Sequence, residues 1–187
     1  MTTATTSPLA ALTGSYVLDP AHSRIGFVAR HAMVTKVRGA FNAFEGTVDL
    51  DGSDPSRSSA RIVIEAASID TRQAQRDEHL RSNDFLAMQE FPQITFVSTS
   101  ARQTGETEFE LTGDLTVKGT SAPVTIPFTY EGTAQDPYGN VRVGFEGSVA
   151  INRKDYGVSY NAALETGGVL ISDKIVLEFE VSAIRNA

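Results

Sequence analysis

The sequence predicts an all-β fold, an antiparallel barrel of about eight strands with one or two short helices closing one end. Apolar and polar residues alternate with a period of two along most of the chain, a pattern typical of strands with one buried face. Such strands indicate antiparallel sheets, and about eight of them in one domain indicate a sandwich or an up-and-down barrel. The barrel is favoured because it removes exposed sheet edges, and its interior is either filled by side chains or holds one small ligand.

The length of 187 residues predicts one domain with a sizeable core. Residues 1–14 are rich in Thr, Ala and Ser, which predicts a flexible leader, and residues 15–187 form the predicted barrel domain. A hydrophobic content of 41% with 21% charged residues argues against a disordered chain.

Eight alternating runs account for the predicted strands. They cover residues 25–31, 44–50, 61–66, 94–96, 109–118, 124–131, 141–151 and 175–183. Turn sequences separate several runs, namely Asp51-Gly52, Thr104-Gly105, Lys118-Gly119, Pro137–Asn140 and Gly167-Gly168. Glycines on the inner rows are interpreted as bends in the sheet that together leave room in the lumen, and these are Gly39, Gly46, Gly113 and Gly147.

The first run ends on a histidine. Alternate residues from Ile25 to His31 share one face, because successive side chains of a strand point to opposite faces. An imidazole on an apolar face needs a partner, since burying an unpaired polar group costs about 1–3 kcal/mol. His31 is therefore either a core histidine satisfied by a backbone carbonyl, Asp77 or Asp155, or a residue that contacts a ligand.

One segment departs from the alternation. Asp70 or Thr71 is positioned to cap a helix that runs through about Arg81. Asp84 is positioned to cap a second short helical turn, which Pro92 ends. We expect these two short helices to close one end of the barrel.

Two polar clusters are candidate functional elements. The first lies on the predicted helix and contains Arg76, Asp77 and His79. It is either a solvated face docked by Leu80 or the polar lip of a cavity. The second is Asn152–Gly157, directly after a predicted strand. It is either a polar connection, with Asp155 pairing Arg153, or a source of charge and a phenol at a cavity mouth.

Composition and motifs exclude several function classes. A net charge of −7 without a basic run argues against nucleic-acid binding. The absence of cysteine excludes thiol catalysis, disulfides and thiolate metal sites. His22, His31 and His79 are too scattered for a metal motif, so neither a metal nor a cofactor is expected. No nucleophile elbow, phosphate-binding loop or dinucleotide fingerprint is present in the sequence.

No apolar run reaches the roughly 20 residues of a membrane helix. The N-terminus also lacks the positive charge and the apolar length of a signal peptide. We therefore expect a cytoplasmic protein, or a periplasmic or secreted one if a signal peptide has been removed.

Several segments together resemble one family. They are Tyr16–His31, Val37–Gly46, Ser68–Thr71, Arg76–Ser82, Asp84-Phe85, Phe91–Ser98, Gly113–Val124 and Ile151–Gly157. In this order, over residues 15–185, the chain resembles the YceI-like family. Tyr16 stands where tryptophan is usual in that family, and the signal peptide of many relatives is not visible.

The resemblance implies a lipocalin-like antiparallel barrel with an elongated apolar cavity for polyisoprenoids, such as polyprenyl pyrophosphates or isoprenoid quinones, or other long amphiphiles. It implies that the polar head of the ligand lies near His31, Arg76, Asp77, His79, Arg153 and Asp155. It implies that the apolar tail lies among Phe27, Phe41, Phe44, Ile64, Leu80, Phe85, Phe96, Leu115, Phe128 and Phe179.

The sequence therefore predicts a non-enzymatic protein that binds and carries or stores a long-chain isoprenoid lipid, either a polyprenyl phosphate or pyrophosphate or an isoprenoid quinone. The expected partner is this lipid or another amphiphile, and a homodimer is the other association considered. The alternative is an enzyme that acts on a bound lipid with His31 and Asp77 as an acid–base pair. A third hypothesis is a structural or signalling module whose interior is filled.

Overall fold

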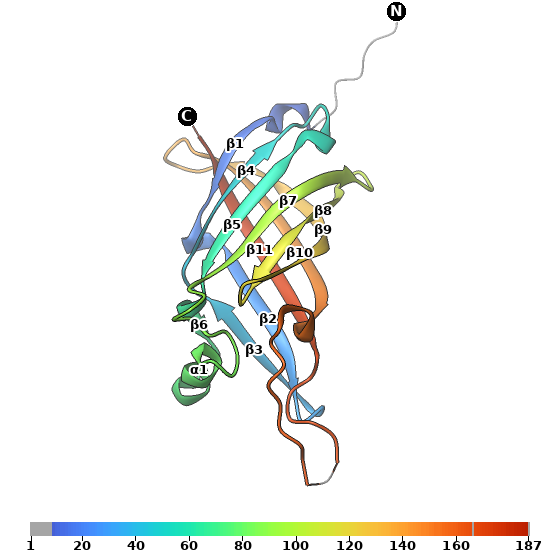
Figure 1. Ribbon diagram of the computed structural model, residues 1–187. Helices are drawn as coiled ribbons and strands as arrows, with labels where there is room; N and C mark the ends of the chain where they lie inside the picture. The colour runs from blue at the N-terminus through green and yellow to red at the C-terminus, as the bar shows by residue number, and fades with distance from the viewer. Residues whose placement is uncertain (1–8, 166, 187) are drawn as a thin grey trace, which may run out of the picture.

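The computed structural model describes residues 9–165 and 167–186 and shows antiparallel strands wound into an elongated barrel (Figure 1). The strands are β1 (Gly14–Leu18), β2 (Arg24–His31), β3 (Thr35–Phe41), β4 (Phe44–Leu50), β5 (Ser59–Glu65), β6 (Ile69–Asp70), β7 (Gln93–Gln103), β8 (Glu108–Val117), β9 (Thr120–Gln135), β10 (Val141–Asn152) and β11 (Lys174–Arg185). The helix is α1 (Ala74–Arg81), and the 3-10 helices are η1 (Ala10–Leu12), η2 (Pro20–His22), η3 (Pro55–Arg57), η4 (Ala66–Ser68) and η5 (Arg153–Tyr156). Within the described ranges, no helix has the length and apolar composition needed to cross a membrane.

Eight of the strands close into a ring. They pair in the order β1-β4-β5-β7-β8-β9-β10-β11, and β1 returns to pair with β11, with Tyr16 opposite Arg185. Each of the eight predicted runs lies on a strand. The predicted fold, a lipocalin-like antiparallel barrel of eight strands, is therefore confirmed.

The ring carries a side branch at one end. The last residues of β11 pair with β1, whereas Val176–Glu180 pair with β2, which is followed in the sheet by β3 and β6. The predicted strand 25–31 is thus β2, outside the ring, and β1 takes its place. Figure 1 shows β2, β3, β6 and α1 together at this end, which we call the α1 end, while η1 and the turn containing η3 lie at the opposite, N-terminal end.

The helix α1 begins later than the sequence predicted. A start at Asp70 or Thr71 is wrong because Arg72 has a left-handed backbone conformation, with φ of 67°. Asp70 Oδ1 instead accepts a hydrogen bond from the backbone N of Arg72 at 2.8 Å. The side chain of Gln73 caps α1 by accepting a hydrogen bond from the backbone N of Arg76.

The second predicted helix, capped by Asp84, is also wrong. Residues 82–91 form consecutive turns, and Ala87 has a φ of 47°, which a right-handed helix does not allow. The apolar residues of this segment still pack against the barrel, since Phe85 is buried in the core. A single α-helix among the described residues therefore covers the α1 end.

The described part of the predicted leader packs onto the barrel. Leu9 and Leu12 are buried, and the Tyr16 hydroxyl donates a hydrogen bond to the carbonyl oxygen of Leu12 at 2.8 Å. Residues 9–14 therefore cover the N-terminal end of the barrel, because the two leucines gain free energy by leaving water. Residues 1–8 of that leader lie outside the described residues.

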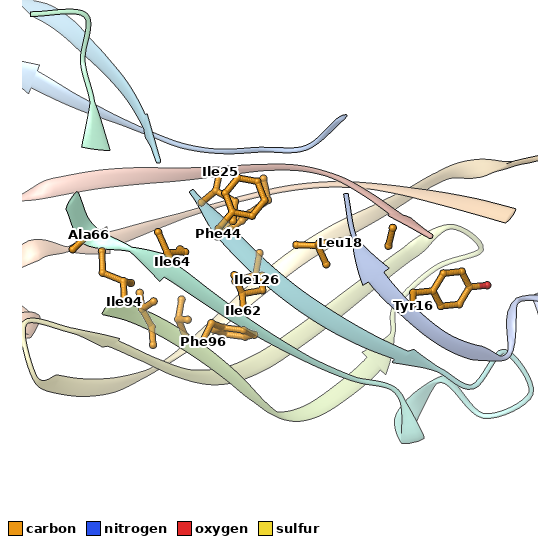
Figure 2. Packing of buried hydrophobic residues seen from close by; sticks show 14 of the residues in the cluster. Tyr16, Leu18, Ile25, Phe44, Ile62, Ile64, Ala66, Ile94, Phe96 and Ile126 are labelled. Carbon is orange, nitrogen blue, oxygen red and sulfur yellow. The ribbon is translucent and has the colours of Figure 1, made fainter. Parts of the chain in front are cut away.

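The core follows the inner rows of the strands. Ile62 on β5, Phe96 on β7 and Ile126 on β9 lie close together in the middle of the barrel (Figure 2). With Phe179 on β11 they form a layer of buried side chains across the lumen, which we call the waist.

The inner glycines accommodate neighbouring side chains. A Cβ atom at Gly39 would lie 2.3 Å from Cζ of Phe27, and one at Gly147 would lie 2.7 Å from Cδ1 of Phe128. A Cβ atom at Gly113 would lie 2.6 Å from Cζ of Phe96, and one at Gly46 would lie 3.1 Å from Cδ2 of Leu18. The interpretation that these glycines leave room in the lumen is therefore wrong, since aromatic and leucine side chains already fill that room.

Candidate functional site

A cavity of about 480 Å³ lies at the α1 end, between the barrel wall and α1. We call it the main cavity. The inward-facing residues of β2 line it in the predicted alternation, from Ile25 to His31. Eight of the ten residues expected to hold a lipid tail also line it, namely Phe27, Phe41, Ile64, Leu80, Phe85, Phe96, Leu115 and Phe179.

The structure places the other two expected tail residues elsewhere. Phe44 is buried in the core without lining the main cavity. Phe128 lines a second, smaller cavity of about 130 Å³ at the N-terminal end, beneath Leu9 and Leu12. The four waist residues line both cavities, so they form the boundary that keeps Phe128 apart from the main cavity.

The polar residues of the main cavity come from the end of β2, the segment that leads into α1, α1 itself, and η5 with the loop that follows it. They are His31, Thr71, Gln73, Arg76, His79, Arg153, Tyr156 and Tyr160. All of these segments lie at the α1 end, while the wall toward the waist is apolar. The cavity therefore has one polar end and one apolar end.

Asp77 holds the segment that leads into α1. Its Oδ1 atom accepts hydrogen bonds from the backbone N of Thr71 at 2.8 Å and from Thr71 Oγ1 at 2.5 Å. Arg76 donates from Nε to Thr71 Oγ1 and from Nη2 to Thr71 O, each at 2.7 Å. Asp77 is buried and does not line the cavity, so it fixes Thr71 and thereby Arg76 instead of facing a ligand.

Three rings pack edge to face at the polar end. The centroid of His79 lies 5.0 Å from that of Phe85 and 5.1 Å from that of Tyr160, and Phe85 and Tyr160 are 5.1 Å apart. His79 Nε2 lies 2.8 Å from Oδ2 of Asp84. This cluster joins α1, the turns after it and the loop after η5.

Arg153 is a buried arginine, with 5% of its surface exposed, that lines the polar end. Its Nε donates to Ser172 O at 3.0 Å, and its Nη1 donates to Val158 O and Tyr160 O, each at 2.8 Å. Burial lowers the pKa of Arg153, and Asp173, 3.9 Å from Nη2, opposes that effect. Nη2 is buried and donates no hydrogen bond within the described residues.

Asp155 does not pair with Arg153. Its side chain is exposed and lies outside the main cavity, because η5 turns it away from the barrel. The acidic neighbour of Arg153 is Asp173. Burial is also the main reason that the pKa of Tyr156 is raised, so this phenol stays neutral at the cavity wall.

His31 lies at the mouth of the main cavity. It lines the cavity and is exposed to solvent, so the cavity reaches the surface there. The side chain makes no hydrogen bond within the described residues, whereas Asp77 is bonded to Thr71. His31 is therefore not a core histidine satisfied by Asp77 or Asp155, and the expected His31–Asp77 pair is not formed.

Many lining residues were not among the expected ligand contacts, and those that follow β10 in the chain include Tyr156, Tyr160, Leu170 and Ile171. Tyr156 belongs to the cluster Asn152–Gly157, which the sequence had identified. The other three lie in the long loop between η5 and β11, where no periodicity indicates which side chains face inward. Among the described side chains, no group of three or more His, Asp or Glu is arranged to hold a metal ion.

Comparison of the sequence with known proteins gives one family. A family model described as a YceI-like domain matches residues 16–183. A UPF0312 protein of Staphylococcus aureus (strain MSSA476) is 38% identical over 170 residues, which cover 90% of this chain and 95% of the relative. A UPF0312 protein of Pseudomonas syringae pv. tomato is 35% identical over 150 residues, covering 79% and 78%.

Solved structures share the fold. BcnA of Burkholderia cenocepacia superposes with a TM-score of 0.78 at 26% identity, covering 88% of this chain and 98% of that chain. A polyisoprenoid binding domain from Saccharophagus degradans superposes with a TM-score of 0.68 at 13% identity, covering 91% and 98%. The family model, the relatives and the barrel agree, and this chain belongs to the YceI-like family.

Proposed function

We propose that this protein binds a long-chain isoprenoid lipid in the main cavity and carries or stores it without transforming it. The observation behind the proposal is a cavity of about 480 Å³ with an apolar wall and polar groups at one end. This arrangement matches a molecule with a long apolar tail and one polar head. The volume lies within the range of about 300–1,000 Å³ that is usual for small-molecule pockets.

Fold similarity supports this ligand class. The domain from Saccharophagus degradans that shares the barrel is named as polyisoprenoid binding. Burial of the tail would supply most of the affinity, at about 0.8 kcal/mol for each buried CH₂. An apolar wall of this kind discriminates weakly between chains of similar shape, so we expect a mixture of related lipids to bind.

The head group would lie between Arg153, Arg76 and Tyr160. A buried guanidinium favours an acceptor, because an unpaired buried donor costs about 1–3 kcal/mol. Nη2 of Arg153 is buried and donates no hydrogen bond within the described residues, its ionic neighbour Asp173 lying 3.9 Å away, and Arg76 presents a second guanidinium at the same end. A phosphate oxygen or a quinone carbonyl oxygen would satisfy Nη2, and no protein-bound metal or separate cofactor is needed.

The geometry favours binding over catalysis. The enzyme alternative relied on His31 and Asp77 as an acid–base pair, and such a pair needs direct hydrogen-bond contact or one bridging water. Asp77 is instead buried against Thr71, outside the cavity that His31 lines. We therefore propose a carrier and not an enzyme.

The test uses lipid extraction and native mass spectrometry of the purified protein, followed by uptake of ubiquinone and decaprenyl phosphate from detergent micelles. We expect a co-purified isoprenoid, or uptake of at least one of the two probes. The proposal fails if the folded wild-type protein holds no long-chain ligand and takes up neither probe.

A matched pair of variants locates the site. Ala29 lines the main cavity, whereas its neighbour Val28 points to the opposite face. Ala29→Trp should fill the cavity and weaken uptake by about tenfold or more, the equivalent of about 1–3 kcal/mol of overpacking. Val28→Trp should leave uptake unchanged, and equal uptake by both folded variants would show that the ligand binds elsewhere.

A further inference from the structure

Two segments form a projecting tip at the α1 end. One is the turn between β2 and β3, and the other is the loop after η5, residues 161–165 and 167–171. The backbone N of Ala32 donates to Leu170 O at 2.7 Å, and His31 pairs with Ile171. Figure 1 shows the turn and the loop extending beyond the barrel on the same side.

The tip exposes apolar side chains to water. Met33 is 56% exposed, Val34 76% and Val169 39%, and these are three of the six large hydrophobic residues exposed in the described chain. Hydrophobic residues gathered at one projecting point indicate a binding surface more strongly than scattered ones do.

The turn keeps these apolar residues at a conformational cost. Ala32 and Met33 have φ of 51° and 59°, and the backbone N of Val34 donates to His31 O at 3.0 Å. A β-turn such as His31–Val34, in which both central residues are left-handed, prefers Asn-Gly at those positions, because other residues are strained there. If this hairpin faced only water, a polar and less strained turn would therefore suit it better than Ala32-Met33.

The same hairpin is locally basic in an acidic protein. Residues 20–44 contain no Asp or Glu, although the whole chain has 23 acidic residues. Arg30 and Lys36 lie directly opposite each other on β2 and β3, both are exposed, and neither forms an ion pair within the described chain. Like charges directly opposite one another destabilise a sheet, so this pair indicates an anionic partner.

The tip is continuous with the mouth of the main cavity. Leu170 and Ile171 of the tip, and His31 at the end of β2, line the cavity, while Met33, Val34 and Val169 do not. We propose that the tip docks on an anionic lipid bilayer, with these three side chains among the acyl chains and Arg30 and Lys36 at the headgroups. Docking is a property beyond the proposed function. It rests on that function in one respect, because the docked protein would take its lipid from the bilayer or return it there.

The first test is flotation with vesicles of equal parts phosphatidylglycerol and phosphatidylcholine, compared with vesicles of phosphatidylcholine alone. We expect binding to the anionic vesicles that weakens as salt is added, because exposed charges are screened. Absence of binding at low ionic strength, or equal binding to both kinds of vesicle, would overturn the proposal.

Variants separate docking from folding. Ala32→Asn combined with Met33→Gly relieves the strained turn, so the protein should unfold at a higher temperature while vesicle binding falls about tenfold. Replacing Arg30 and Lys36 by Gln should weaken binding roughly fivefold for each charge. The controls are Val97→Thr, on the barrel wall, and Arg57→Gln, at the N-terminal end, and both should bind like wild type.

Lipid uptake distinguishes failure of docking from failure of the proposed function. The tip variants should still take up ubiquinone from detergent micelles, since the changed residues do not line the cavity, but they should take it up slowly from anionic vesicles. Uptake from micelles with no vesicle binding would refute docking alone, whereas a wild-type protein that takes up nothing from either source would refute lipid binding. An equal loss of vesicle binding in the Val97→Thr control would also contradict the assignment of the tip.

Discussion

Arg153 shows how one side chain can organise the polar end of the cavity. Its Nε and Nη1 atoms hold carbonyl oxygens of Ser172, Val158 and Tyr160, so it fixes the loop that follows η5 from both ends. The planar guanidinium suits this task, because a lysine ammonium cannot present several donors in a rigid fork. The same residue therefore shapes the cavity, while its buried Nη2 donates no hydrogen bond within the described residues and lies 3.9 Å from Asp173 Oδ1.

Gly147 gives a prediction at the residue scale. A Cβ atom there would lie 2.7 Å from both Phe128 Cδ1 and Pro127 O, so Gly147→Leu should overpack the barrel and lower the free energy of unfolding by about 1–3 kcal/mol. Urea denaturation measures this change. Gly144→Ala on the same strand is the control, since its Cβ would meet nothing closer than 3.7 Å. A Gly147→Leu protein of wild-type stability would refute this explanation.

At the scale of elements, Arg142 links two turns at the N-terminal half of the barrel. Its Nη1 lies 2.7 Å from Oδ2 of Asp19, which caps η2, and its Nε lies 2.9 Å from Oδ2 of Asp136, at the end of β9. The hydrogen bond from Arg142 is the largest reason that the pKa of Asp19 is lowered. Desolvation raises the pKa of Asp136, but hydrogen bonds from Asn140, Arg142 and Tyr138 outweigh it and lower the pKa to about 2.

The link predicts how stability depends on pH. A carboxylate with a lowered pKa in the folded state contributes stability above its unfolded value, here 3.8, and loses it as pH falls toward about 2. Arg142→Gln should therefore lower the melting temperature near neutral pH, and its difference from wild type should vanish below about pH 2. Thermal unfolding followed by circular dichroism measures both the melting temperature near neutral pH and the difference from wild type at low pH.

The control for this link is Arg102→Gln. Arg102 forms an exposed pair with Glu110 at 2.7 Å, and such surface pairs contribute about 0–1 kcal/mol. The melting curve of the Arg102→Gln protein should follow that of wild type at every pH. An Arg142→Gln protein whose difference from wild type persists at low pH would contradict the assignment to Asp19 and Asp136.

At the scale of the whole molecule, the waist divides the interior and limits the length of the tail. Ile62, Phe96, Ile126 and Phe179 separate the main cavity from the smaller one beneath Leu9. Phe96→Leu should open a passage, so that longer isoprenoid chains gain about 0.8 kcal/mol for each additional CH₂ that they bury. Native mass spectrometry with a series of polyprenols measures the shift toward longer chains.

The matched substitution is Phe85→Leu at the opposite end of the main cavity. It should change affinity for all chain lengths to a similar extent, since Phe85 packs against His79 and Tyr160, away from the waist. Identical length preferences for Phe96→Leu and Phe85→Leu would show that the waist does not set the length.

Much of the fold could be predicted because alternation is a local property. The eight runs and the face shared by Ile25 and His31 follow from a period of two, and the structure has both. Local signals failed where a backbone conformation decided the outcome. The left-handed Arg72 delays α1, and turns replace the helix expected after Asp84.

The site was only partly predictable, because it joins residues that are distant in sequence. Packing of α1 against a loop without periodicity brings together His79, Phe85 and Tyr160. Nothing in the local sequence indicates that Tyr160 faces this cluster. Asp77 and Asp155 were expected near the head group because both are carboxylates in the segments predicted to form the polar end of the cavity. The structure turns the first toward Thr71 and the second toward solvent.

The sequence by itself determined a β-barrel of the YceI-like family, its strands and eight of the residues in the apolar wall of its cavity. Those properties follow from periodicity and motifs that each segment contains on its own. Only the tertiary structure decided that β1 closes the ring, that the waist divides the lumen, and that His31 stands exposed at the mouth. Ring closure and side-chain packing depend on contacts between remote segments, and no local pattern in the chain encodes such contacts one by one.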